Sequence, residues 1–161
     1  MRRYLFAVGV TLATAVAWIL VLPEAPVAQP IAFNHAKHRA AGCIVCHSGV
    51  SEGARAGIPQ GDLCLRCHAA APARGVPAAV WTDIAAGRKI AWRQVTEIPD
   101  HVRFSHRRHT GVAGLACASC HGDMQARTIP FDRAPIRLQM DTCLSCHTRE
   151  GASEDCAGCH R

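Results

Sequence analysis

The sequence predicts a mostly irregular fold of short α-helices, preceded by one long apolar helix at the N-terminus. Three observations lead to this prediction. Of the 161 residues only 5% are aromatic, so ordinary side chains offer little to fill an interior. The chain also contains 10 Cys and 10 His, an unusual supply of residues that bind cofactors. The longest uncharged apolar run lies close to the start of the chain.

The N-terminal segment, residues 1–22, is predicted to be a single transmembrane helix. Arg2 and Arg3 precede an uncharged run over residues 4–22. Such a run would measure about 28 Å as a helix, close to the hydrocarbon thickness of a bilayer. The two arginines favour a cytoplasmic N-terminus, which would leave the rest of the chain in the periplasm of a bacterium, at the cytoplasmic (inner) membrane. A cleaved signal peptide is the alternative, although the small-residue cleavage patterns lie inside the apolar run.

A linker over residues 23–32 follows the apolar run. Three prolines occur between residues 23 and 30. Proline excludes a regular helix and keeps the backbone extended. We therefore expect this stretch to separate the N-terminal helix from the rest of the protein.

The pattern Cys-x-x-Cys-His occurs five times and uses every cysteine of the chain. We number these motifs 1 to 5 in chain order. Two thiols at this spacing can add to the two vinyl groups of one haem, and the following imidazole then becomes an axial ligand of the iron. The sequence therefore predicts five covalent c-type haems, attached by Cys43, Cys46 and His47, by Cys64, Cys67 and His68, by Cys117, Cys120 and His121, by Cys143, Cys146 and His147, and by Cys156, Cys159 and His160.

Other uses of paired cysteines fit this pattern poorly. Zinc held by four thiolates needs two Cys-x-x-Cys pairs, and five pairs do not divide in that way. A thioredoxin-like redox pair would occur once, within a βαβ pattern that the sequence lacks. A disulfide framework would give no reason for a histidine after every second cysteine.

Five histidines lie outside the motifs, one for each predicted haem. Four of them belong to two copies of the pattern Phe-x-His-x-x-His, which begin at Phe33 and Phe104. Histidines three positions apart project from the same side of a helical turn, so each copy can reach two neighbouring irons. Met124, Met140 and Lys37 are the competing sixth ligands. Neither methionine lies in a repeated pattern, and Lys37 lies between two better candidates, His35 and His38. We therefore expect bis-histidine irons, closed to substrates, with His35, His38, His101, His106 and His109 as distal ligands.

The net charge of +6 arises from 18 basic and 12 acidic residues. The basic residues are scattered rather than gathered in a stripe, which argues against a nucleic-acid partner. Five haems with their propionates would bring the charge close to neutral. Their apolar macrocycles would also supply the interior that side chains do not.

The repeated patterns divide the rest of the chain into two related modules. Residues 33–68 form a module for two haems, and residues 104–161 form a module for three. The connecting segment, 69–103, is predicted to contain a short helix within residues 77–89 and an extended stretch over residues 91–98.

The combination of Phe-x-His-x-x-His with Cys-x-x-Cys-His resembles the class III cytochromes, the cytochrome c3 and cytochrome c7 families. Residues 92–109 and the lead-in to motif 4, residues 140–142, look more specifically like the pentahaem subunit of alternative complex III. The resemblance implies a membrane-anchored periplasmic domain that works beside an iron–sulfur protein and quinol-binding membrane subunits. It also implies an electron acceptor in the periplasm, such as a small cytochrome c, and the same distal histidines.

The expected role is that of an electron-transfer subunit rather than an enzyme in its own right, because the haem supplies the redox chemistry. A related role is a quinol-dehydrogenase cytochrome that feeds a periplasmic reductase. A catalytic multihaem reductase would need one iron with an open position, which the count of histidines disfavours. A haem filament would need the N-terminal helix to be removed. The direction of electron flow and the pairing of each distal histidine with its iron stay open.

Overall fold

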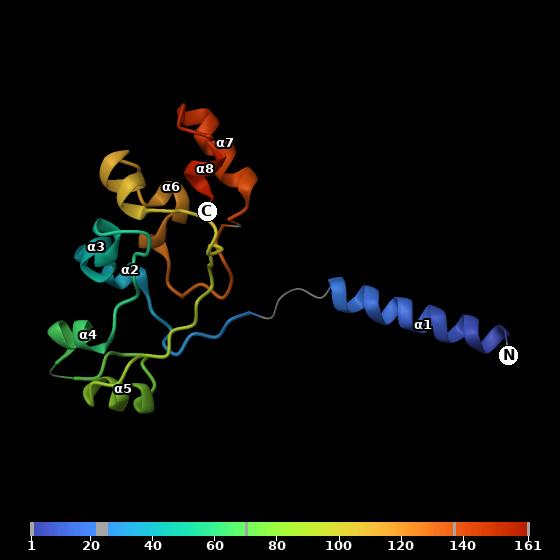
Figure 1. Ribbon diagram of the computed structural model, residues 1–161. Helices are drawn as coiled ribbons and strands as arrows, with labels where there is room; N and C mark the ends of the chain where they lie inside the picture. The colour runs from blue at the N-terminus through green and yellow to red at the C-terminus, as the bar shows by residue number, and fades with distance from the viewer. Residues whose placement is uncertain (1, 22–25, 70, 137, 161) are drawn as a thin grey trace.

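A computed structural model describes residues 2–21, 26–69, 71–136 and 138–160. Parts of the predicted anchor and linker, residues 1 and 22–25, lie outside the described residues. Helix α1 (Arg2–Val21) has 20 residues and stands apart from the body in Figure 1. Within the described part of the chain, however, no helix is both long and apolar enough to cross a membrane. The structure thus contains the predicted N-terminal helix but does not support it as a transmembrane one.

Where it is described, the linker forms neither helix nor strand, and it is hydrogen-bonded to the body of the protein. The amide of Val27 donates to the carbonyl of Asp132 at 2.8 Å. The side chain of Gln29 exchanges two hydrogen bonds with the backbone of Arg93, at 2.8 and 3.0 Å. Ile31 is buried. This part of the chain therefore belongs to the body of the protein.

The body consists of short helices joined by irregular segments. The described residues contain no strand, only an isolated antiparallel bridge between Val102 and His160. This confirms the predicted fold of short helices and loops. The helices are α2 (His35–His38), η1 (Arg39–Ala41), α3 (Cys43–Cys46), η2 (Ser48–Ser51), α4 (Gly61–His68), α5 (Ala78–Ala85), the π-helical turn η3 (Arg107–Val112), α6 (Ala118–His121), η4 (Met124–Ala126), α7 (Met140–Glu150) and α8 (Cys156–Cys159).

The connecting segment contains the predicted short helix, whereas its predicted extended stretch pairs with no strand. Helix α5 begins directly after Pro77, as expected for a residue that fits the start of a helix. Residues 91–98 form no strand, and two of their amides bond outside any ladder, since Trp92 donates to the carbonyl of Ile90 and Arg93 to the side chain of Gln29. Gln60 accepts from the amide of Ile90 at 2.8 Å, and the indole of Trp92 donates to the carbonyl of Pro59 at 2.9 Å.

The hydrophobic core is very small and lies at the contact between α4 and α5. Among the described residues, the buried hydrophobic side chains are Ile31, Ile84 and Ile90, of which Ile84 is fully buried. Gly61 permits the close approach of the two helices, since a Cβ there would lie 2.9 Å from Cγ2 of Ile84. A core of this size stabilises one end of the body and leaves the rest to other interactions.

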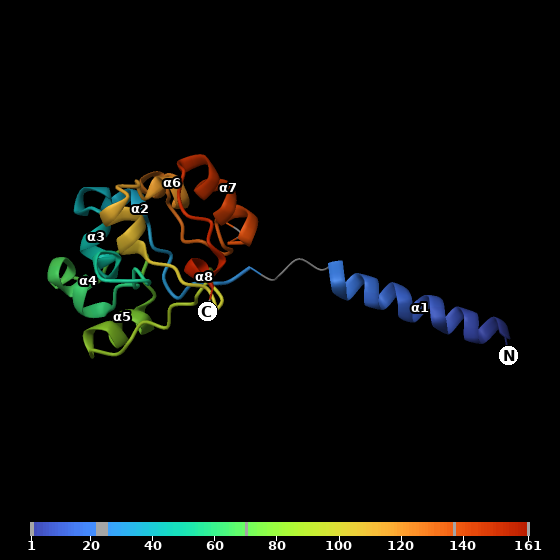
Figure 2. The same ribbon diagram turned by 45° about the horizontal axis from the view of Figure 1, so that its top comes forward.

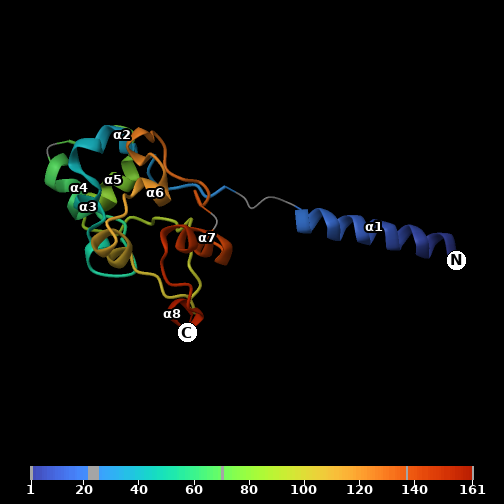
Figure 3. The ribbon, with the colours of Figure 1, turned by 90° about the horizontal axis from the view of Figure 1, so that it is seen from above.

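The helices follow one another across the body rather than forming a layered core. In Figure 1, α4 and α5 lie at one end and α7 and α8 at the other, with α2, α3 and α6 between them. Figure 2 and Figure 3 turn the molecule and keep α4 and α5 well away from α7. The five Cys-x-x-Cys-His motifs are therefore spread over the whole body.

Candidate functional site

Each motif lies on a short helix, as the sequence predicts. Motifs 1 and 5 coincide with α3 and α8, motif 3 begins one residue before α6, and motifs 2 and 4 lie within α4 and α7. One helical turn brings the two cysteines of a motif to the same side. All 10 cysteines are free thiols, the state that thioether formation requires. Apolar side chains around motif 1 face outward, with Ile44 60% and Val45 54% exposed.

The predicted distal histidines approach the motif histidines in pairs. Two metal–nitrogen bonds of about 2 Å, and about 1 Å from each nitrogen to its ring centre, place the centroids of two axial imidazoles roughly 6 Å apart. The observed centroid distances are close to this value. They are 6.1 Å for His38 and His68, 6.3 Å for His106 and His121, 6.2 Å for His109 and His147, and 5.5 Å for His101 and His160.

His35 and His47 are the two histidines that the other four pairs leave over, so they are matched by elimination; the charge of His47 also acts on His35. Burial lowers the pKa of His35, and the neighbouring charges of His47, His38 and Arg127 lower it further. Burial likewise lowers the pKa of His121, with further contributions from His106 and His47. The imidazoles of His35 and His121 are therefore neutral near pH 7, the form that binds a metal.

Hydrogen bonds fix the tautomer of five of these imidazoles. A backbone carbonyl only accepts, so the Nδ1 atom that bonds to it carries the proton and Nε2 is left to bind iron. The N···O distances lie between 2.6 and 2.9 Å. The bonds join His38 to Asn34, His47 to Gly57, His106 to Ala54, His109 to Ser105 and His147 to Ser153. His35 differs, because its Nδ1 is buried without a hydrogen-bond partner.

Phe33 and Phe104 each contact both histidines of one predicted distal pair, a role that was not predicted from the sequence. Phe33 meets His35 edge-on at 4.8 Å and stacks on His38 at 4.6 Å. Phe104 repeats this geometry, at 4.9 Å from His106 and 4.7 Å from His109. The signal was present in the sequence, since phenylalanine stands two positions before the first histidine in both copies.

The thiols of different motifs lie close enough to influence one another. Burial raises the pKa of Cys43, and Cys117 of motif 3 raises it further. Burial also raises the pKa of Cys64 and of Cys143. Additional increases come from Cys46 of motif 1 at Cys64, and from Cys159 of motif 5 at Cys143. Motif 1 therefore neighbours motifs 2 and 3, and motif 4 neighbours motif 5.

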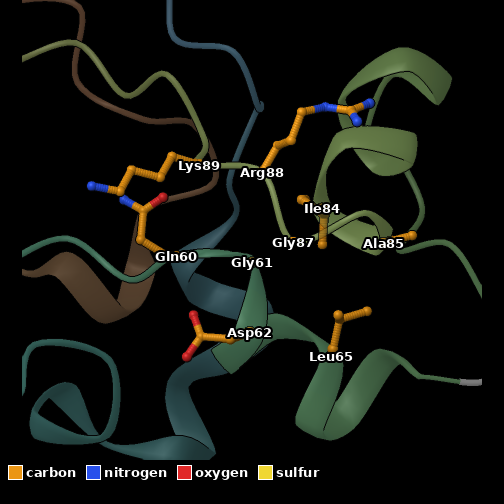
Figure 4. A pocket seen from close by; sticks show the side chains of 9 residues that line it. All are labelled: Gln60, Gly61, Asp62, Leu65, Ile84, Ala85, Gly87, Arg88 and Lys89. Atoms are coloured by element: carbon orange, nitrogen blue, oxygen red, sulfur yellow. The ribbon is translucent and has the colours of Figure 1, made fainter.

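Cavities lie at two junctions of the body. One of about 430 Å³ separates motifs 1 and 3 and is lined by Ile44, Val50, Val112 and Cys117 among others. Another, of about 260 Å³, lies between α4 and α5. Figure 4 shows Leu65 of α4 below Ile84 and Ala85 of α5 in this cavity. Its lining includes Leu65 from within motif 2 but no motif cysteine or histidine.

The residues fit c-type haem in three respects: free thiols at the right spacing, imidazole pairs at the right separation and Nε2 atoms left available. Within the described residues, no group of three or more His, Cys, Asp or Glu is arranged to hold a bare metal ion. Paired imidazoles are the axial donors that a bis-histidine haem iron takes.

Comparisons with known proteins agree with this chemistry. Residues 102–161, which contain motifs 3 to 5, match the family described as cytochrome c7 and related cytochrome c. The chain is also 28% identical over 192 aligned positions to the "Menaquinone reductase, multiheme cytochrome c subunit" of Nitratidesulfovibrio vulgaris. That alignment covers 97% of this chain and 89% of the relative. The chain is thus similar to multihaem c-type cytochromes, and c-type haem is the cofactor that this similarity implies.

Proposed function

We propose that the protein is a relay of single electrons, with five bis-histidine c-type haems, inside a membrane complex that exchanges electrons with a quinone. The observation that carries this proposal is the approach of four motif imidazoles to a second imidazole, at centroid distances of 5.5–6.3 Å, with one histidine left for the fifth. An iron with two imidazoles has no free position for a substrate, so it can pass electrons but does not bind a small oxyanion.

The bound haems supply the one-electron chemistry, and the chain supplies their environment. The thiols and the motif imidazoles fix each macrocycle to a helix. The distal imidazoles close the sixth position and keep the reorganisation small when the charge of the iron changes. The backbone carbonyls of Ala54, Gly57 and Ser153 orient three of the imidazoles through Nδ1.

The quinone link is supported by the relative whose name places it in a menaquinone reductase. The partners that we propose are an iron–sulfur subunit, quinone-binding membrane subunits and a soluble periplasmic electron carrier such as a small cytochrome c. In an assembly like alternative complex III, electrons would leave quinol and pass to the periplasmic carrier. The name of the relative favours the opposite direction as a second candidate, from the periplasmic carrier toward menaquinone.

We further propose that the body lies on the periplasmic side of the bacterial cytoplasmic membrane, attached through the N-terminal helix. Arg2 and Arg3 at the start of α1 and the exposed Tyr4, Phe6 and Trp18 support this attachment. Carbonate washing of membranes tests it. Retention of the haem protein in the pellet is expected, whereas release together with a mature N-terminus at residue 18 or later would show that a signal peptide had been removed.

Purification of the tagged protein from gently solubilised membranes tests the complex. We expect iron–sulfur and quinone-binding subunits to copurify, and we expect the haems to be reduced by a menaquinol analogue within the complex. The direction follows from a second assay, in which the prereduced complex is offered the quinone. A complex that leaves the haem redox state unchanged with both quinol and quinone would overturn the proposal.

A further inference from the structure

We infer that the five haem sites form one unbranched line in the order 2–1–3–4–5, which differs from their order along the chain. The inference deepens the proposed relay and rests on it. It makes motif 2 and motif 5 the two ends, where electrons enter and leave. In each step one ferrous iron loses one electron and the neighbouring ferric iron gains it, with no bond formed or broken.

Helix α2 joins sites 2 and 1. Its single turn carries both His38, which faces His68 of motif 2, and His35, the histidine left for His47 of motif 1 once the other four pairs are formed. Phe33 touches both of these distal rings. Two irons whose distal ligands are three residues apart on one turn are neighbours.

The loop at residues 53–57 joins sites 1 and 3. The carbonyl of Gly57 accepts from Nδ1 of His47, and the carbonyl of Ala54 accepts from Nδ1 of His106, both at 2.7 Å. The loop thus orients the motif ligand of site 1 and the distal ligand of site 3. It packs closely against η2, because a Cβ at Gly49 would collide with the carbonyl oxygens of Arg55 and Ala56. The cavity between Ile44 and Cys117 lies at the same junction.

The second Phe-x-His-x-x-His segment joins sites 3 and 4. His106 faces His121 of motif 3, and His109 faces His147 of motif 4. Phe104 touches both distal rings, as Phe33 does in the first segment. Sites 3 and 4 therefore repeat the arrangement of sites 1 and 2.

A short connection joins sites 4 and 5. The carbonyl of His147 accepts from the amide of Ala152 at 2.8 Å, and Nδ1 of His147 donates to the carbonyl of Ser153 at 2.6 Å. Asp155 then caps α8 by accepting from the amide of Gly158 at 2.9 Å. The ring centroid of His101 lies 5.5 Å from that of His160, and this pair completes site 5.

Site 2 shares α2 with site 1, and site 5 follows site 4 along the chain, while the segment at residues 101–103 that pairs with α8 carries no predicted ligand other than His101; this makes sites 2 and 5 the ends of the line. Site 2 lies on α4, beside α5 and the small hydrophobic core, whereas site 5 lies on α8. Figure 1 and Figure 3 show α4 and α8 on opposite sides of the body. The order of the chain would instead make motif 1 an end and motif 2 an internal site.

A reversible block at single sites distinguishes the two orders. Removal of a distal imidazole opens one iron, and carbon monoxide then holds that iron in the ferrous state and prevents it from relaying. His35→Ala blocks site 1 and His38→Ala blocks site 2, so the two variants are a matched pair on one helical turn. A ruthenium photoreductant on a cysteine introduced at the exposed Ala152 delivers electrons at the other end, near sites 4 and 5.

The measured quantity is the number of ferric haems reduced in the fast phase under carbon monoxide. The order 2–1–3–4–5 predicts three for His35→Ala, because site 2 is cut off, and four for His38→Ala. Chain order predicts the reverse, four and three. A branched arrangement predicts four in both variants. Either of the last two results would overturn the inference.

Two controls keep this test independent of the proposed function. In the labelled parent protein all five haems should be reduced, with or without carbon monoxide. If only the haems near the label were reduced, the relay itself would be contradicted rather than its order. Each variant must retain five haems with one iron open to carbon monoxide. If an alanine variant loses haem, the corresponding glycine variant matured with added imidazole gives the same comparison, since carbon monoxide displaces imidazole from ferrous iron.

Discussion

The two Phe-x-His-x-x-His segments have the same pattern and almost the same ring geometry, yet their first histidines differ in surroundings. In both segments the phenylalanine meets the first imidazole edge-on and stacks on the second, with interplanar angles of 82° and 23° in one and 89° and 24° in the other. The second imidazole also behaves alike, because Nδ1 of His38 and of His109 bonds to a carbonyl four residues earlier. These features are local and follow the pattern.

The first imidazole depends on distant parts of the chain. His106 donates from Nδ1 to the carbonyl of Ala54, 52 residues away. Nδ1 of His35, in contrast, has no hydrogen-bond partner among the described residues. The local helix differs too, since α2 is α-helical and His106 leads into the π-helical turn η3. A short pattern thus determines how two ligands stand relative to each other, while tertiary contacts determine how strongly each ligand is polarised.

The largest expected effect comes from removing a first histidine. His106→Ala should convert one of five irons to a high-spin, carbon-monoxide-binding state, because the sixth position loses its ligand. The haem should stay attached through its thioethers, so a pyridine haemochrome assay should still give five haems per chain. The parent protein should be almost wholly low-spin and should not bind carbon monoxide.

His101→Ala tests the site that lies outside the repeated pattern. Its expected result is the same single high-spin iron, since His101 faces His160 at 5.5 Å. A variant that kept five low-spin irons would show that another side chain closes site 5. Stoichiometric binding of carbon monoxide to the parent protein would instead favour a catalytic reductase.

Removing a phenylalanine should have the next largest effect. Phe104→Ala takes away a partly buried ring that contacts two ligands, at a cost of about 1.5–3 kcal/mol from lost burial. Phe33→Ala is the matched variant in the other segment. We expect both to lower the denaturant midpoint of unfolding by similar amounts, measured at the Soret band. Unequal losses would show that the two segments are supported differently despite equal ring geometry.

Side-chain hydrogen bonds to the first turn of each segment should separate the two segments by a smaller amount. Asn34 accepts from the amide of Lys37 at 3.0 Å, and Ser105 accepts from the amide of Arg108 at 3.4 Å. Asn34→Ala should therefore cost about 1 kcal/mol, a typical value for a helix cap, and Ser105→Ala should cost less because its bond is long. Thermal unfolding of the two variants beside the parent measures this difference.

The smallest expected effect is a difference in potential between the two first-histidine sites. A hydrogen bond from Nδ1 makes an imidazole a stronger donor and stabilises ferric iron, which lowers the potential. One net hydrogen bond of about 0.5–1.5 kcal/mol corresponds to roughly 20–60 mV for one electron. Sites 1 and 3 each contain one such bond, at the motif ligand His47 and at the distal ligand His106, so their potentials should differ by less than this range. A redox titration followed by EPR, with His35→Ala and His106→Ala to assign the signals, measures the difference.

The sequence predicted the short helices and the chemistry of the motifs because both depend on residues within one turn of each other. The ligand pairs were beyond it, since His101 and His160 meet across 59 positions and the bridge at Val102 that aligns them is not encoded in any local pattern. The expected extended stretch at residues 91–98 pairs with no strand, and its amides at Trp92 and Arg93 bond instead to Ile90 and to the distant side chain of Gln29. Pattern alone also could not show that Ile31 belongs to the core.

The pairing of imidazoles has a consequence for how the protein is made. In each pair the distal histidine precedes the motif histidine along the chain: His35 before His47, His38 before His68, His106 before His121, His109 before His147 and His101 before His160. In the relay that we propose, a chain exported from its amino-terminal end would present every sixth ligand before the thiols that capture the corresponding haem. Each newly attached iron could then be closed at once, which would spare the nascent protein an open haem that reacts with oxygen or peroxide during maturation.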